Sequence, residues 1–308
     1  MDVFFLILIE VILPVFILIG AGAFLHRKFT FDLNTLSKLT TYFLIPAISF
    51  VNIYESNIGG ETMLITVGLL TLHNVCLILL CSAAAKAAKF DASMSSTFKN
   101  SVVLINAGNF GLPVSQLIFQ TNPLGASIQV IVLLFQNFLN YTYGLMNCIS
   151  AKSTATASML KELVKNPIIF TSILGLILNI MAVDIPSVIW GPVENTANAF
   201  IAIALVTLGA QSAYLKLNRI TLPLVLSLAG RLIISPIIAL IFLWMFGISG
   251  TVAQALFIAS SFPSSRNSAL FALEYHHYPN LAAQIVLVST LLSSITVTIV
   301  VYLSKVLF

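Results

Sequence analysis

The sequence predicts an all-α membrane protein, and composition is the first observation behind this prediction. Of the 308 residues, 59% are hydrophobic and only 8% are charged, and the mean hydropathy is +1.04. Soluble domains carry about 25% charged residues, so the composition excludes a water-soluble protein. The expected surroundings are a lipid bilayer, and the net charge of +4 does not indicate a nucleic-acid partner.

The second observation is the length of the apolar stretches. A helix needs about 20 apolar residues to cross the hydrocarbon core, and charges, Gly and Pro divide the chain into ten transmembrane helices of this kind. We predict them at residues 3–25, 36–54, 62–87, 95–119, 124–149, 166–182, 193–214, 221–246, 251–275 and 279–304. The first stretch is too long for a signal peptide and is expected to remain in the mature protein.

The basic residues predict how these helices are oriented. Because positively charged loops stay in the cytoplasm, the odd-numbered loops are predicted to be cytoplasmic, with both termini outside the cell membrane. Eleven of the 14 Lys and Arg residues flank odd-numbered loops, namely Arg27, Lys28, Lys38, Lys86, Lys89, Lys99, Lys152, Lys161, Lys165, Lys216 and Arg219.

The third observation is an internal repeat. Pro14 precedes Pro167 by 153 residues, and Pro113 precedes Pro263 by 150 residues. Each half contains five predicted spans, and an odd number of spans means that the second half enters the membrane upside down, as an inverted repeat. The predicted division is a first five-helix repeat at 1–150, a short cytoplasmic linker at 151–165 and a second repeat at 166–308.

Two polar, proline-containing breaks interrupt the fourth and ninth spans. One runs from Asn106 to Pro113 and the other from Ser260 to Ser268. In hydrocarbon, irregular backbone persists only where protein surrounds it or where it lines a watery cavity. Matched breaks in two halves point to the binding site of a transporter, whereas a single break can also be a simple kink.

Each break is expected to begin a second half-helix whose free N–H groups and positive dipole end attract an anion. Gly108 and Gly111 are expected to allow close backbone approach and unusual backbone conformations. Pro113 and Pro263 suit the first turn of the restarting helix. The predicted substrate-binding residues are Asn106, Gly108, Asn109, Gly111, Pro113, Asn137, Pro263, Ser264, Arg266 and Asn267.

Arg266 stands out because a charge at the centre of a span costs about 2.5 to 3.5 kcal/mol. Its planar guanidinium can bind a carboxylate with two hydrogen bonds. The alternative is structural: the side chain satisfies free carbonyls of the broken helix or pairs with Glu274. The sequence leaves both interpretations open.

Other polar residues within spans have less specific meanings. Arg231 is expected to snorkel to the interface, and His73 is either a proton relay or a hydrogen-bonded core residue. Asn137 either lines a cavity or forms a hydrogen bond to another helix. Asn52 and Gln136 are further cavity candidates.

Enzyme chemistry has little support in this sequence. It contains no hydrolase, metalloprotease or phosphate-binding motif, and no base lies near the serine cluster at 264–268 to activate a nucleophile. The three cysteines, Cys76, Cys81 and Cys148, lack metal-ligand spacing. We therefore expect no metal, no cofactor and no catalytic site.

The chain resembles the auxin efflux carrier family in its bacterial form, over essentially its whole length. The likeness lies in the run Asn106–Pro113 of the fourth span and the run Phe262–Asn267 of the ninth. It implies crossing fourth and ninth helices, a scaffold and a transport domain, elevator-like movement and a homodimer. It assigns carboxylate binding to Asn106 or Asn109, and it makes 45–50 and 136–142 cavity-facing stretches.

The chain also departs from that family. Plant members have Asn-Pro-Asn-Thr-Tyr where this chain has Asn106 to Phe110, and a neutral residue is commoner at the position of Arg266. The resemblance therefore implies organic acids such as malate or malonate rather than auxin. We predict a secondary carrier of a small organic anion; the alternatives are a non-transporting receptor or scaffold and a sodium- or proton-coupled antiporter or symporter.

Overall fold

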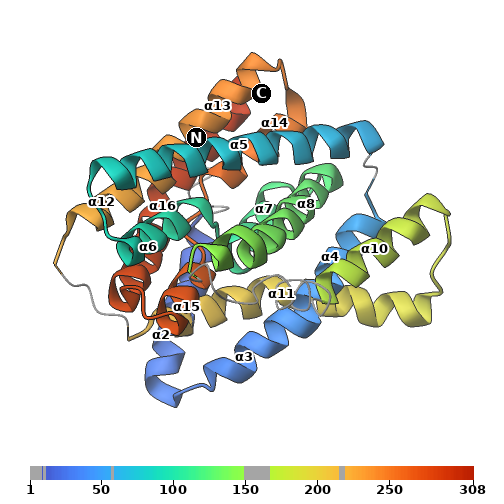
Figure 1. The fold of residues 1–308 in the computed structure, drawn as a ribbon. Helices are drawn as coiled ribbons and strands as arrows, with labels where there is room; N and C mark the ends of the chain where they lie inside the picture. Colours follow the sequence, from blue (N-terminus) through green and yellow to red (C-terminus); the bar gives the residue numbers. More distant parts are fainter. Residues whose placement is uncertain (1–8, 10–11, 57–58, 149–166, 215–218) are drawn as a thin grey trace.

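The computed structural model describes residues 9, 12–56, 59–148, 167–214 and 219–308, and this part of the chain is helical (Figure 1). The first half contains α2 (Leu13–Phe29), α3 (Leu33–Leu39), η2 (Thr40–Leu44), α4 (Ile45–Tyr54), α5 (Gly60–Ala87), α6 (Ala92–Val103), η3 (Ala107–Gly111), α7 (Leu112–Ile118), α8 (Pro123–Leu139) and η4 (Asn140–Gly144). The second half contains α10 (Pro167–Ile180), α11 (Ser187–Ser212), α12 (Leu222–Ala229), η5 (Gly230–Ile234), α13 (Ser235–Met245), α14 (Gly250–Ser260), α15 (Arg266–Glu274) and α16 (Pro279–Leu307). The η segments are short π-helical turns.

Six of the helical stretches are long and apolar enough to cross a membrane, and α10 and α14 are shorter apolar helices. The six are Leu33–Tyr54, Gly60–Ala87, Pro123–Gly144, Ser187–Ser212, Leu222–Met245 and Pro279–Leu307. These helices and their apolar exposed surfaces confirm an all-α membrane protein. The predicted linker at 151–165 lies outside the described residues.

Helix ends follow local chemistry. The helix α2 continues to Phe29, four residues beyond the predicted end, because His26, Arg27 and Lys28 in its last turn favour the negative end of the helix dipole. The helix α11 begins at Ser187, six residues before its prediction, and continues through Pro192.

One packing group consists of α2, α4, α10 and α11. The helix α2 packs along α11, and α10 packs along α4 (Figure 1). A Cβ placed on Gly22 would lie 2.1 Å from the Val206 carbonyl oxygen, and one on Gly209 would lie 1.8 Å from the Ile19 carbonyl oxygen. Glycine therefore allows the backbones of α2 and α11 to approach closely, as in other membrane helix pairs.

A second packing group surrounds the two broken spans. The helix α14 packs against α8, α13 and α16, while α6 packs against α5 and α12. Figure 1 shows α7 and α8 lying between α5 on one side and α11 on the other. The Phe110 and Phe262 rings, both fully buried, meet edge to face with centroids 6.0 Å apart. Segments about 150 residues apart thus meet in the protein core.

Candidate binding site at the helix crossover

Both polar breaks are true helix ends. The helix α6 stops at Val103, α14 stops at Ser260, and the extended segments that follow pair as an antiparallel bridge between Ile105 and Ser264. The Asn106 N–H donates to the Pro263 carbonyl at 2.9 Å, and the Ser265 N–H donates to the Leu104 carbonyl at 2.8 Å. Each break thereby supplies hydrogen-bond partners that the other needs in an apolar environment.

Side chains from neighbouring helices complete the crossover. The Ile105 N–H donates to Gln136 Oε1 at 3.3 Å, and the Ser264 N–H donates to Ser289 Oγ at 3.1 Å. The Ser264 hydroxyl donates to the Ser101 carbonyl at 2.6 Å. Ser264 is therefore a buried structural residue of the crossover, and Gln136 from α8 supports the extended segment that contains Ile105.

The second half-helices restart differently from one another. Pro113 lies in the first turn of α7, as predicted, but the same prediction for Pro263 is wrong. Ser265 caps α15 by accepting the Asn267 N–H, so Pro263 precedes that helix and supplies its carbonyl to the crossover instead. The hydroxyl cap makes a proline in the first turn unnecessary.

The two glycines of η3 also differ. A Cβ on Gly111 would lie 2.6 Å from the Phe262 ring, whereas one on Gly108 would make ordinary contacts of 3.5 Å. Close approach is therefore required at Gly111 alone. The expectation of unusual backbone conformations is wrong, because neither glycine has a positive φ angle; both continue a π-helical turn.

A cavity of about 360 Å³ lies in front of the crossover. It extends from the exposed residues Asn34 and Lys38 of α3 to the buried residue Asn106, which is 6% exposed. It is lined by Asn34, Ser37, Lys38, Thr41, Tyr42, Ile45, Ile105, Asn106, Ala107, Gly108, Asn109, Leu133, Gln136, Asn137, Asn140, Tyr141, Ile168, Ser265, Arg266, Asn267 and Leu270.

The cavity brings together most, but not all, of the predicted site residues. Asn106, Gly108, Asn109, Gln136, Asn137, Arg266 and Asn267 line it. Gly111, Pro113, Pro263 and Ser264 do not, and form the crossover behind it. Asn52 lies elsewhere, where its carbonyl accepts a hydrogen bond from Ser127, and His73 lines a different cavity.

Arg266 is the first residue of α15 and is half-buried in the cavity wall. Its Nη1 donates to Ser37 Oγ at 3.0 Å. The exposed Glu274 stands at the other end of the same helix, about 12 Å along its axis, so within the described chain the two residues form no ion pair. A positive side chain therefore adjoins the positive end of a helix, and no carboxylate is among the described residues that line the cavity around it.

The cavity also contains amide groups with spare hydrogen-bonding capacity. Within the described residues, Asn106 Nδ2, Asn137 Nδ2 and Asn140 Oδ1 are buried without a hydrogen-bond partner. Buried polar groups are nearly always paired, and leaving one unpaired costs about 1 to 3 kcal/mol. Ligand oxygen atoms could accept hydrogen bonds from Asn106 and Asn137 beside Arg266.

Sequence reasoning missed the wall opposite the crossover. Asn34, Ser37, Lys38 and Thr41 come from the start of the second span, where Lys38 contributed only to the orientation prediction. Their spacing of three to four residues places polar groups on one helix face, and this pattern could have revealed them. Asn140 continues the amide run that includes Gln136 and Asn137.

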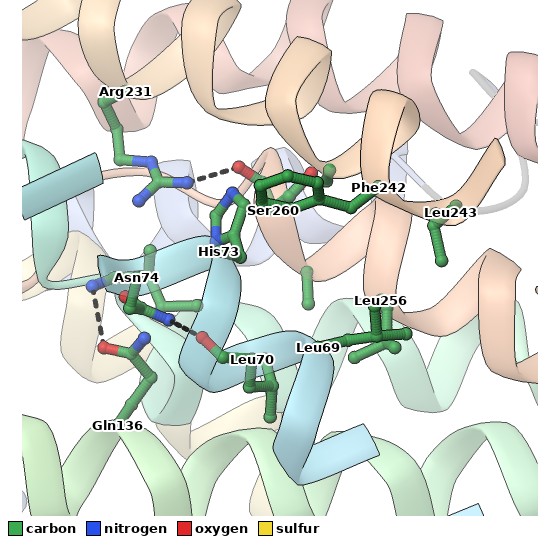
Figure 2. A pocket seen from close by; sticks show the side chains of 13 residues that line it. Leu69, Leu70, His73, Asn74, Gln136, Arg231, Phe242, Leu243, Leu256 and Ser260 are labelled. Atoms are coloured by element: carbon green, nitrogen blue, oxygen red, sulfur yellow. Dashed lines mark hydrogen bonds between the residues drawn. The ribbon is translucent and has the colours of Figure 1, made fainter. Parts of the chain in front are cut away.

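The interfacial position predicted for Arg231 is wrong. The side chain is 1% exposed and bonds to carbonyl groups at the crossover instead of reaching for the membrane surface (Figure 2). It lines a second, smaller cavity of about 30 Å³ together with His73. His73 Nε2 lies 3.1 Å from the Ser235 carbonyl oxygen, a hydrogen-bonded position that leaves its relay role a prediction.

Comparison with known proteins identifies the family of this chain. A family model described as "membrane transport protein" matches residues 7–301, which defines the class of protein. The chain belongs to this family, that of the auxin efflux carriers. Among curated proteins nothing matches the chain.

Proposed function

We propose that this membrane transport protein is a secondary carrier of a small organic anion, most simply a carboxylate, and that the anion binds in the 360 Å³ cavity at the crossover. The observation that carries the proposal is Arg266, a cation at the N-terminal end of α15 with a hydroxyl as its protein partner. Helix N-termini bind anions through free N–H groups and the dipole. The guanidinium adds a full charge and a geometry that fits carboxylates.

The rest of the cavity supports a small, polar ligand. Its volume is near the lower end of the range of about 300 to 1,000 Å³ for ligand sites. Asn106 and Asn137 offer neutral donors, and Lys38 places a second cation at the exposed end. No acidic side chain is among the lining residues of this described cavity, so its potential favours anions.

Transport requires that the site reach each side of the membrane in turn. The cavity lies between α3 and η2, which pack on the first group, and the crossover, which belongs to the second group. The Arg266–Ser37 hydrogen bond joins the two groups and would break if the second group slid past the first. This arrangement supports an elevator-type movement with the first group as scaffold.

Ten membrane crossings in two inverted repeats fit the same account. Gly22 packs α2 on α11 and Gly175 packs α10 on α4, and these glycines are 153 residues apart, as are Pro14 and Pro167. Equivalent glycines thus serve equivalent contacts between the halves. The scaffold group would supply the face through which a homodimer forms.

The orientation follows from the basic loops. The cavity opens beside α3, which carries Lys38 and follows Arg27 and Lys28 at the end of α2. Basic residues around a loop indicate that the loop faces the cytoplasm. The structure then corresponds to a carrier of the plasma membrane that is open to the cell interior, with both termini outside.

Uptake by proteoliposomes tests the proposal. Purified protein should take up labelled carboxylates from a panel of mono- and dicarboxylic acids above the level of protein-free liposomes. Arg266→Ala should abolish most of this uptake, while Glu274→Ala, its control at the far end of α15, should not. Carboxylate binding without uptake would show a receptor rather than a carrier, and equal loss in both variants would make Arg266 structural.

A further inference from the structure

Arg231 is the largest fully buried side chain in the described chain, and the anion cavity does not include it. It extends from η5 in the eighth span to the side of the crossover away from that cavity. Its Nη1 donates to the Val102 carbonyl at 2.7 Å, and its Nη2 donates to the Ser260 carbonyl and to Ser235 Oγ. Figure 2 shows the guanidinium directed at Ser260, with the His73 ring beside it.

The two carbonyls that Arg231 contacts belong to the ends of both broken spans. Val102 lies in the last turn of α6, and Ser260 is the last residue of α14. The last four carbonyl groups of a helix have no partner within it, and together they carry a partial charge of about −0.5. One guanidinium therefore binds the negative ends of two half-helices that come together in the core.

Within the described residues, this charge is balanced by the helix ends and not by a carboxylate. The cavity beside the guanidinium is lined by no Asp or Glu, and no ion pair of Arg231 is present in the described chain. Removal of the guanidinium would leave two negative helix ends facing each other in a region of low dielectric. In carriers with broken helices, such half-helix C-terminal ends and unwound carbonyls coordinate a mobile cation.

We propose that Arg231 is a positioning residue, a built-in cation that takes the place of a mobile one and holds the ends of α6 and α14 in the geometry that forms the anion site. The inference rests on the proposed carrier function. With Arg231 in this role, transport by the native chain is independent of Na⁺ and K⁺. It also predicts that a small side chain at position 231 creates a site for a monovalent cation or for free guanidinium.

The link to the anion cavity is direct. Ile105 and Gln136 line both cavities, and the Ile105 N–H bonds to Gln136 Oε1. A shift of α6 and α14 at Arg231 would therefore move the backbone that carries Asn106. A second positive charge at His73 would be repelled by the guanidinium, which disfavours proton coupling through this histidine.

The test compares wild type, Arg231→Ala and Arg231→Lys in proteoliposomes whose buffers contain Na⁺, K⁺ or only N-methylglucamine. Wild type should take up the carboxylate equally in all three. Arg231→Ala should lose about tenfold or more in N-methylglucamine, the scale expected when buried carbonyls lose a charged donor, and should regain uptake with Na⁺ or with guanidinium below denaturing concentrations. Arg231→Lys, which keeps the charge, should retain more uptake than Arg231→Ala.

A second measurement separates this role from a folding defect. Guanidinium at the same concentration should raise the melting temperature of Arg231→Ala in detergent and leave that of wild type unchanged, and it should not restore uptake to Arg266→Ala. The inference would be overturned if no cation restored the uptake or raised the melting temperature of Arg231→Ala. It would also be overturned if Arg231→Lys were as inactive as Arg231→Ala. Uptake by wild type only in Na⁺ would overturn it while leaving the carrier function intact, whereas no uptake in any buffer would overturn the carrier function itself.

Discussion

Two glycines of the same π-helical turn provide a controlled test of the crossover. In Gly111→Ala, the new methyl group would lie 2.6 and 2.7 Å from two Phe262 ring carbons and 2.9 Å from Gln129 Nε2. Normal carbon contacts are about 3.5 to 4.0 Å, so the ring must move by about 1 Å. Phe262 is fully buried and adjoins Pro263, whose carbonyl pairs with Asn106, so the displacement would disturb the crossover.

The matched change, Gly108→Ala, adds the same methyl group at contacts of 3.5 Å. Alanine is favoured over glycine in a helix by about 0.5 to 1 kcal/mol, and this gain is common to both variants. The difference between them is therefore the overpacking cost alone, about 1 to 3 kcal/mol. At about 2 °C per kcal/mol for a chain of this size, Gly111→Ala should melt about 2 to 6 °C below Gly108→Ala.

Melting in detergent, followed by size-exclusion chromatography of the heated protein, measures this difference. Uptake should fall in Gly111→Ala even at temperatures where the variant remains folded, because the moved crossover carries the anion site. Equal melting temperatures for the two variants would refute the close approach at Gly111.

Three further predictions follow from single groups. Arg266→Lys keeps the charge but loses the planar pair of donors, so carboxylate affinity measured by uptake competition should fall about five- to 150-fold, equivalent to about 1 to 3 kcal/mol; unchanged affinity would contradict the paired contact. Hydrogen bonds donated by the Met94 N–H and, second, by the Tyr278 hydroxyl lower the pKa of the Asp91 carboxyl below its ordinary 3.8. The stability that this helix cap contributes is therefore present above pH 3.8 and is lost as the pH falls through the lowered pKa. The melting temperature of Asp91→Asn should depend less on acid pH than that of wild type. In a cysteine-free background, cysteine at the exposed position Glu61 should react with an impermeant reagent in intact cells and cysteine at Lys28 only after lysis; the opposite pattern would reverse the orientation.

The sequence predicted the helical class, the two breaks and residues of the crossover side of the cavity, because these depend on local chemistry. Apolar length identifies spans, and Gly, Pro and amide side chains mark irregular backbone wherever they interrupt an apolar run. Pro113 behaves as predicted because a helix start is a local matter. Pro263 does not, because Ser265 caps α15 and Pro263 lies three residues before Arg266, the first residue of that helix.

Arg231 could not be placed from the sequence because its partners are distant along the chain. The Val102 carbonyl is 129 positions away, and only the packing of the eighth span on the crossover makes interior carbonyls nearer than the membrane surface. The place of Lys38 in the cavity wall could not be predicted for a related reason. In the sequence, a basic residue at a helix end indicates only the orientation of the helix, and the fold is needed to place it at the cavity.

The most direct test of the central claim is protection of the cavity by the transported anion. Thr41, which lines the cavity and is half-buried, is replaced by cysteine in a cysteine-free protein and alkylated in proteoliposomes with a small reagent. The transported carboxylate should slow this alkylation, with a half-effective concentration that matches its transport affinity, and should leave alkylation of a cysteine at position 28 unchanged. A carboxylate that is transported but leaves the cysteine at position 41 fully reactive would contradict the assignment of the binding site to this cavity.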